Sequence, residues 1–120
     1  MNFIVPLVVY PFDVMVSFGE SDKDIKMNLN YFNIGDSDLW MYETDNDAGR
    51  CCSFKGNKTL IRLRKSPKTD EDYSFLQHEI FHAVTMIMHK IGIRLSIGKS
   101  DEAYAYLIGY LTKKIYEKIK

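Results

Sequence analysis

Residues 70–91 hold the feature that most constrains this chain, a long helical pattern that carries two histidines. His78 and His82 stand four residues apart in the sequence His-Glu-Ile-Phe-His, and Glu79 follows the first of them. Residues four apart on a helix lie one above the other, so both imidazoles can point at one position. Two such nitrogens can bind a single zinc ion, and the neighbouring carboxylate can accept a proton from a bound water.

The helix that carries the histidines has clear start and stop signals. Thr69 or Asp70 supplies a cap followed by acidic residues, and Gly92 follows the last apolar positions. Because the pattern is apolar around most of its circumference, we expect this helix to be buried in the middle of the domain. Buried imidazoles need partners, and a metal ion supplies one. The alternative is two surface or core histidines that are satisfied by backbone carbonyls.

A third ligand is expected from outside this pair. His89 shares the histidine face, but it lies seven residues beyond His82, about 10 Å along the axis. We therefore interpret His89 as a surface or packing histidine. Glu102 stands in the first turn of a second predicted helix, residues 101–119. A helical hairpin would bring that turn back beside the histidines, and catalytic zinc commonly has two His, one Glu and a water. The alternative is that Asp101 and Glu102 merely complement the helix dipole.

The remaining segments predict strands and one further helix. Val, Ile and aromatic residues are frequent in the predicted strands, which are residues 3–10, 14–18, 39–43, 49–55 and 59–65. Gly56-Asn57 indicates a hairpin between the last two, and the prolines favour an edge position for the first. Acidic residues after Ser21 predict a helix over residues 22–32, with Ile25, Leu29 and Phe32 on one face. The predicted fold class is α+β, with a small, mostly antiparallel sheet packed on the histidine helix and a C-terminal helix.

Composition excludes several other classes of protein. A length of 120 residues fits one domain, residues 1–120, and the formal net charge of zero gives no reason to expect nucleic acid or membrane as a partner. No apolar run approaches the roughly 18 residues of a membrane span, and no export signal is recognised, so we expect a cytoplasmic protein. Cys51 and Cys52 are adjacent and make no disulfide framework. We expect one of them in the core and the other exposed.

Two of these motifs together resemble a known family. His-Glu-x-x-His at 78–82 and Asp-Glu-Ala at 101–103, twenty residues after the second histidine (82 to 102), are similar to the motifs of the gluzincins. These form the thermolysin-like branch of the zincin metallopeptidases, and their third ligand is a Glu in an Asn-Glu-Ala or similar segment. The resemblance covers about residues 59–112 and implies a minimal zincin-like fold. It implies zinc ligands at His78, His82 and Glu102, and a general base at Glu79. The whole chain is also similar to small zincin-like proteins encoded by bacteriophages.

The resemblance implies two further features and departs from the family in one. Zincins bind substrate along an edge strand, which by analogy is the segment of residues 59–64. Large family members have a second domain that contributes a transition-state-stabilising group, and this chain ends one helix after Glu102. Tyr106 shares the Glu102 face of the helix, where it could hydrogen-bond a ligand nitrogen or polarise a substrate carbonyl. The alternative is that the helix tyrosines, Tyr106 among them, only pack the core.

The function that we predict from these residues is zinc-dependent hydrolysis of peptide bonds in a peptide or protein substrate. Glu79 would take a proton from the metal-activated water and pass it to the leaving amine. Two alternatives belong to other classes of protein. One is a non-catalytic zincin-like module whose metal serves structure or partner binding. The other is a metal-free interaction protein, such as a phage-encoded regulator of a host factor, in which the motif is accidental.

Overall fold

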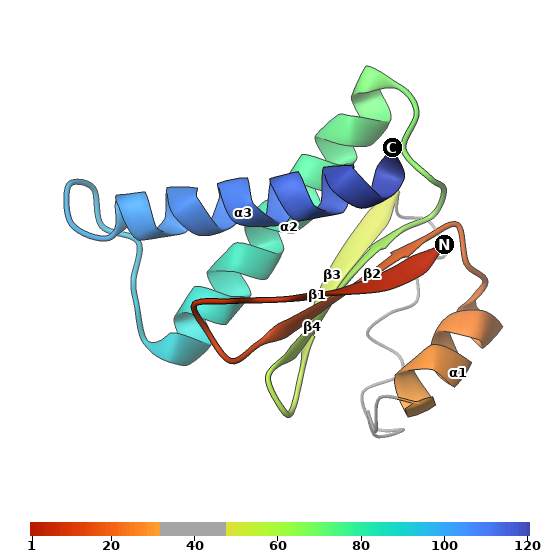
Figure 1. Cartoon of the computed structure of the whole chain (residues 1–120), viewed down its shortest axis with the longest axis horizontal. Coiled ribbons are helices and arrows are strands. Elements are labelled where there is room, and N and C mark those ends of the chain that lie inside the picture. Colours follow the sequence, from red (N-terminus) through yellow and green to blue (C-terminus); the bar gives the residue numbers. More distant parts are fainter. Residues whose placement is uncertain (32–47) are drawn as a thin grey trace.

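The computed structural model describes residues 1–31 and 48–120, and this part of the chain forms a sheet and three helices (Figure 1). The strands are β1 (Asn2–Pro6), β2 (Asp13–Phe18), β3 (Gly49–Phe54) and β4 (Lys58–Leu63). The helices are α1 (Asp22–Tyr31), α2 (Asp70–Ile91) and α3 (Asp101–Ile119). The predicted α+β class and its mostly antiparallel sheet are confirmed.

The sheet has the strand order β1-β2-β4-β3. The outer pairs β1–β2 and β3–β4 are antiparallel, and the central pair β2–β4 is parallel. The predicted hairpin between β3 and β4 is confirmed: Gly56 and Asn57 have φ angles of 77° and 58°. The first strand lies at an edge, as its prolines predicted. The predicted strand over residues 39–43 and the predicted contact of Phe32 lie outside the described residues.

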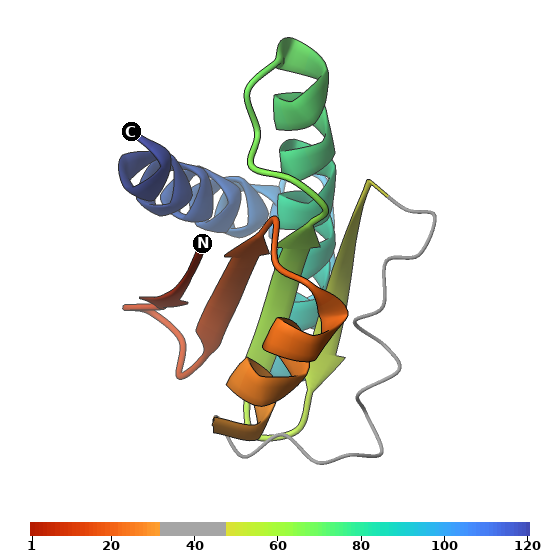
Figure 2. The same ribbon diagram turned by 90° about the vertical axis from the view of Figure 1, so that its right-hand side faces the viewer.

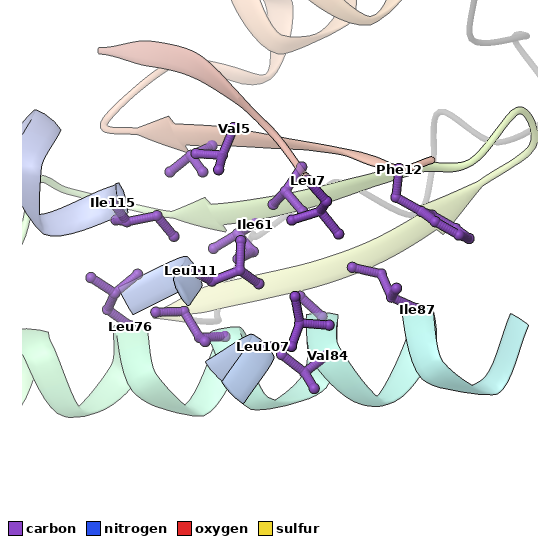
Figure 3. Close-up of a cluster of buried hydrophobic side chains, with 14 of the residues drawn as sticks. Val5, Leu7, Phe12, Ile61, Leu76, Val84, Ile87, Leu107, Leu111 and Ile115 are labelled. Carbon is purple, nitrogen blue, oxygen red and sulfur yellow. The ribbon is translucent and has the colours of Figure 1, made fainter. Parts of the chain in front are cut away.

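The helices cover the two faces of the sheet unequally (Figure 2). Helices α2 and α3 lie on one face, where Leu76, Ile87 and Leu111 pack with Ile61 in the larger hydrophobic cluster (Figure 3). Helix α1 lies on the other face, where Ile25 and Leu29 pack in a smaller cluster. The sheet can pack against both clusters because successive side chains of each strand point to opposite faces.

The ends of α2 agree with the predicted signals. Thr69 is the N-cap: its side chain accepts a hydrogen bond from the Asp72 N–H (3.1 Å), and the Asp72 carboxylate accepts one from the Thr69 N–H (3.1 Å). This reciprocal pair is a capping box, which satisfies two backbone donors at the start of the helix. Gly92 ends the helix with a φ of 89°, in the left-handed region that favours glycine.

Two predictions about burial and edges are wrong. Helix α2 is not buried on all sides, because one side packs on the sheet, another on α3, and a strip with His78 and His82 remains exposed. The segment of residues 59–64 is not an edge strand either, because β4 lies between β2 and β3. Its apolar residues point to both faces of the sheet, which is typical of an interior strand. The edge strand beside α2 is β3.

The two cysteines point to opposite faces of β3, as expected of neighbours in a strand. Cys52 is buried on the α1 side. Cys51 is half-buried on the other side, where its Sγ lies 3.9 Å from the Met86 Sδ on α2. The expectation that one cysteine is exposed is therefore wrong. Burial raises the pKa of both thiols, that of Cys52 to about 12, so both stay protonated at neutral pH.

Within the described ranges, 1–31 and 48–120, no helix combines the length and apolar character that crossing a bilayer requires.

Candidate metal centre

The two motif histidines meet on the exposed side of α2. The Nε2 atoms of His78 and His82 are 3.0 Å apart, and the ring planes are inclined at 76° with centroids 4.6 Å apart. Two nitrogens at 2.0–2.1 Å from one zinc ion and at the tetrahedral angle lie about 3.4 Å apart. The observed separation therefore differs from that of a ligand pair by a few tenths of an ångström, and the donor atoms fit zinc.

The same separation also permits a direct hydrogen bond between the two imidazoles. A neutral imidazole carries one N–H donor and one acceptor nitrogen, so either ring can donate to the other. The His78 side chain is 67% exposed, which means that solvent can also satisfy it. The sequence argument that buried imidazoles require a metal therefore does not apply. The convergence of the two Nε2 atoms is the observation that remains.

Glu79 lies between the His78 ring and the start of β3. The residue is 8% exposed, and its Oε1 atom lies 3.9 Å from the His78 Nε2. A Cβ added to Gly49 would lie 3.2 Å from the Glu79 Cγ and only 2.6 Å from the Leu63 Cδ2. Gly49 therefore lets the edge strand approach the helix at the carboxylate. Sequence reasoning missed this residue, although a glycine at the start of a strand signals close backbone approach.

The contact between β3 and α2 continues for the length of the strand. Cys51 packs on Met86 near the middle of β3. At its end the Lys90 ammonium donates a hydrogen bond to the carbonyl of Phe54 (2.6 Å). Partial burial there lowers the pKa of Lys90. Because His82 precedes Met86 by four residues on the helix, the histidine pair faces the outer side of this edge strand.

A hollow of about 280 Å³ lies one turn before the motif, and its walls come from α2, the end of β4 with the two residues after it, and Ala48, which precedes β3. Leu63 and Phe75 give it an apolar side. The Lys65 ammonium is 3.3 Å from the buried carboxylate of Asp72 at its polar side. The hollow is large enough for a side chain of a molecule that lies beside the histidines.

The structure does not bring Glu102 to the histidine pair. Helices α2 and α3 are joined as a hairpin, in which the Gln77 amide donates hydrogen bonds to Thr112 and Tyr116 (both 3.2 Å). The turn of α3 beside the motif is therefore about ten residues, or roughly 15 Å, beyond Glu102. The first turn of α3 lies instead near the end of α2, where the Tyr104 hydroxyl donates to the Ile93 carbonyl (2.6 Å).

Tyr106 and His89 are also away from the pair. Tyr106 is 62% exposed and lines a small hollow with Val8 and Val9, in the loop between β1 and β2. His89 is exposed in the last turn of α2, as expected of a surface histidine. Among residues 1–31 and 48–120, no three His, Cys, Asp or Glu side chains form a group that could hold a metal ion. Glu102 as ligand and Tyr106 as catalytic residue stay predictions.

No protein-family model, curated protein or solved structure matches this chain. The gluzincin resemblance therefore rests on the two short motifs.

Proposed function

We propose that this protein is a zinc-dependent peptidase in which His78 and His82 hold the metal and Glu79 is the general base. The observation that carries the proposal is the 3.0 Å separation of the two Nε2 atoms on an exposed strip of α2. Both histidines are exposed. The predicted cytoplasmic location belongs to the same proposal.

The side chains of this site have separate tasks. A bound zinc ion would supply a water of lowered pKa and would polarise the scissile carbonyl. Glu79, with its Oε1 at 3.9 Å from the His78 Nε2, accepts the proton of the attacking water and returns it to the leaving amine. The packing of Glu79 against Gly49 limits its rotamers, so the carboxylate is held in place before substrate arrives.

The edge strand β3 is the element that would orient the substrate. In the described part of the chain, β3 pairs with β4 alone, so its outer edge faces away from the sheet. An extended peptide along that edge would pass the histidine side of α2, and the hollow at Leu63 and Phe75 could accept one of its side chains. This assigns to β3 the role that the family resemblance had given to residues 59–64.

A second candidate is a zinc-binding module without catalysis. The described structure brings two protein ligands together, fewer than the three that a catalytic zinc site commonly has, so the remaining ligands of such a module would come from a partner molecule. The two candidates differ in the role of Glu79, which is a proton acceptor in the first and a packing residue in the second.

The test compares wild-type protein with Glu79→Gln, both purified without a histidine tag. Zinc content measured by elemental analysis should be equal in the two proteins, because Glu79 is not a ligand. Cleavage of a mixed peptide library, read by mass spectrometry, should fall by about 10²–10⁴-fold in the variant. Equal cleavage by both proteins would contradict the role of Glu79, and zinc binding without cleavage by either would favour the non-catalytic module.

A further inference from the structure

The edge of the sheet farthest from the histidines is β1, whose only strand neighbour in the described residues is β2. The ladder between them starts with the Phe18 N–H bonding to the Met1 carbonyl (2.8 Å). The same pattern continues just past the end of β1, where the Leu7 N–H donates to the Phe12 carbonyl (2.9 Å). Because hydrogen-bonded pairs alternate along antiparallel strands, the odd-numbered residues of β1 are those that bond to β2.

The even-numbered residues of β1 therefore turn their backbone groups outward. Asn2 and Ile4 each present an N–H and a carbonyl at the outer edge. Pro6 is at the third such position. Proline has no backbone N–H, and an N–H at this position would point away from β2, so the pairing of β1 with β2 loses no hydrogen bond. Its carbonyl accepts a hydrogen bond from the Tyr110 hydroxyl on α3 (3.3 Å). The outer edge is thus open at Asn2 and Ile4 and closed at Pro6.

A groove of about 410 Å³ runs between this edge and the second half of α3. Its floor is uncharged, since it is made by the segment from Ile4 to Val8. Its wall carries Lys114, Glu117 and Lys118 from α3. The Lys114 ammonium lies 3.8 Å from a Glu117 carboxylate oxygen, which leaves one lysine of this wall in excess.

On the α3 side of this edge the charge of the surroundings has the same sign, whereas on the α1 side the Glu20 carboxylate accepts a hydrogen bond from the Asn2 amide (2.8 Å). Residues 1–12 contain no charged side chain, and after Glu102 the single acidic residue of the chain is Glu117. The second half of α3 carries three lysines, at positions 113, 114 and 118, and Lys120 follows its last residue. An occupant of the groove therefore meets apolar surface and backbone donors on one side and positive charge on the other.

We propose that this groove binds an extended acidic segment of a partner protein, which adds to the sheet as a strand beside β1. The outward groups of Asn2 and Ile4 supply its main-chain hydrogen bonds, and carboxylates at alternate positions face the lysines of α3. A second copy of this chain fits less well, because pairing of β1 with itself would bring two lysine-rich walls together. The site is separate from the histidine pair, and its binding does not depend on zinc.

The first test uses hydrogen exchange measured by NMR on wild-type protein. The probe is a short peptide that alternates glutamate with valine, and the control is the same peptide with lysine for glutamate. The Ile4 amide should become protected when the glutamate peptide is added, whereas the Phe3 and Val5 amides are protected with or without it. An Ile4 amide that exchanges equally fast in all three samples overturns the proposal.

The second test uses two variants with the same change of net charge. Lys114→Gln with Lys118→Gln should weaken binding of the fluorescein-labelled glutamate peptide by at least about three-fold in fluorescence anisotropy. Lys23→Gln with Lys26→Gln, on the exposed side of α1, should leave it unchanged. Equal affinity of the two variants overturns the charge argument. If the protein sediments as a dimer and the Ile4 amide is protected before peptide is added, the occupant of the groove is a second copy of this chain and the proposal of an acidic partner segment is wrong.

Discussion

The two edges of the sheet are built alike but lie beside different helix surfaces. Each edge strand is the outer member of an antiparallel pair, β1 with β2 and β3 with β4. Beyond β3 lies the histidine side of α2, with Glu79 packed on Gly49. Beyond β1 lies the lysine-rich side of α3, with Tyr110 bonded to Pro6. The comparison teaches that the helix beside an edge, rather than the strand itself, decides which chemistry that edge can support.

The largest effect should come from removing a histidine of the pair. Loss of a group that hydrogen-bonds and orients a zinc ligand typically weakens metal binding by about 10–100-fold. His82→Ala removes a ligand itself, so we expect it to weaken zinc binding by more than this. His89→Ala, on the same exposed side of α2, is the matched control and should change nothing. Competition with a zinc-chelating dye measures both. If the two variants bind zinc equally well, the β3 edge has no metal site, and the contrast between the edges disappears.

The close approach at Gly49 can be broken with one methyl group. In Gly49→Ala the new Cβ would lie 2.6 Å from the Leu63 Cδ2 and 2.9 Å from the Arg62 carbonyl oxygen. We expect a loss of about 1–3 kcal/mol in the free energy of unfolding, as for other overpacked sites.

Gly109→Ala on α3 is the matched control for that substitution, because nothing lies within 4 Å of its new Cβ. It should gain about 0.5–1 kcal/mol from helix propensity. Urea denaturation of both variants gives the two free energies. A Gly49→Ala protein as stable as wild type would show that the Leu63 side chain and the start of β3 can shift to admit the methyl group.

The capping box fixes the start of the helix that carries the histidines. Thr69→Ala removes the side-chain acceptor of the Asp72 N–H, and we expect a loss of about 1 kcal/mol in the free energy of unfolding. The Ser74 hydroxyl, one turn later on the exposed side, donates a hydrogen bond to the Glu71 carbonyl (2.6 Å), and its removal in Ser74→Ala should cost little. An equal loss in both variants, measured by thermal unfolding, would argue against a specific cap.

Acid should weaken the same cap. Hydrogen bonds from the backbone of Thr69 and Lys68 lower the pKa of Asp72 from 3.8 to about 2. A carboxylate whose folded pKa is depressed stabilises the protein fully above its unfolded pKa, and the contribution is lost as the pH falls toward the folded pKa. Stability should therefore decline between about pH 4 and pH 2, and Asp72→Asn should flatten that part of the profile. A variant profile that parallels wild type would assign the decline to other groups.

The smallest effect is expected at Glu102, the residue implied by the family resemblance. Because its turn of α3 lies beside the end of α2, Glu102→Ala should leave zinc affinity unchanged. A loss as large as that of His82→Ala would show that α3 moves to the pair when zinc binds. The third ligand would then be the one that the motif predicted.

The sequence by itself determined the local structure. The Thr69 cap, the acidic first turn and Gly92 predicted the bounds of α2, the acidic first turn predicted the start of α3, and Gly56-Asn57 predicted the hairpin, since these signals act within a few residues. The meeting of His78 and His82 was also predictable, because a spacing of four on a helix fixes it.

Tertiary structure decided which strand lies at an edge and which side of each helix faces it. The parallel pairing of β2 with β4 places β4 inside the sheet, and no local signal in residues 59–64 encodes that partner. The hairpin of α2 and α3 separates Glu102 from the histidines, because the contacts of Gln77 with Thr112 and Tyr116 set how far the helices overlap. Contacts between segments distant in sequence are set by packing of the whole core, and a short motif carries no information about them.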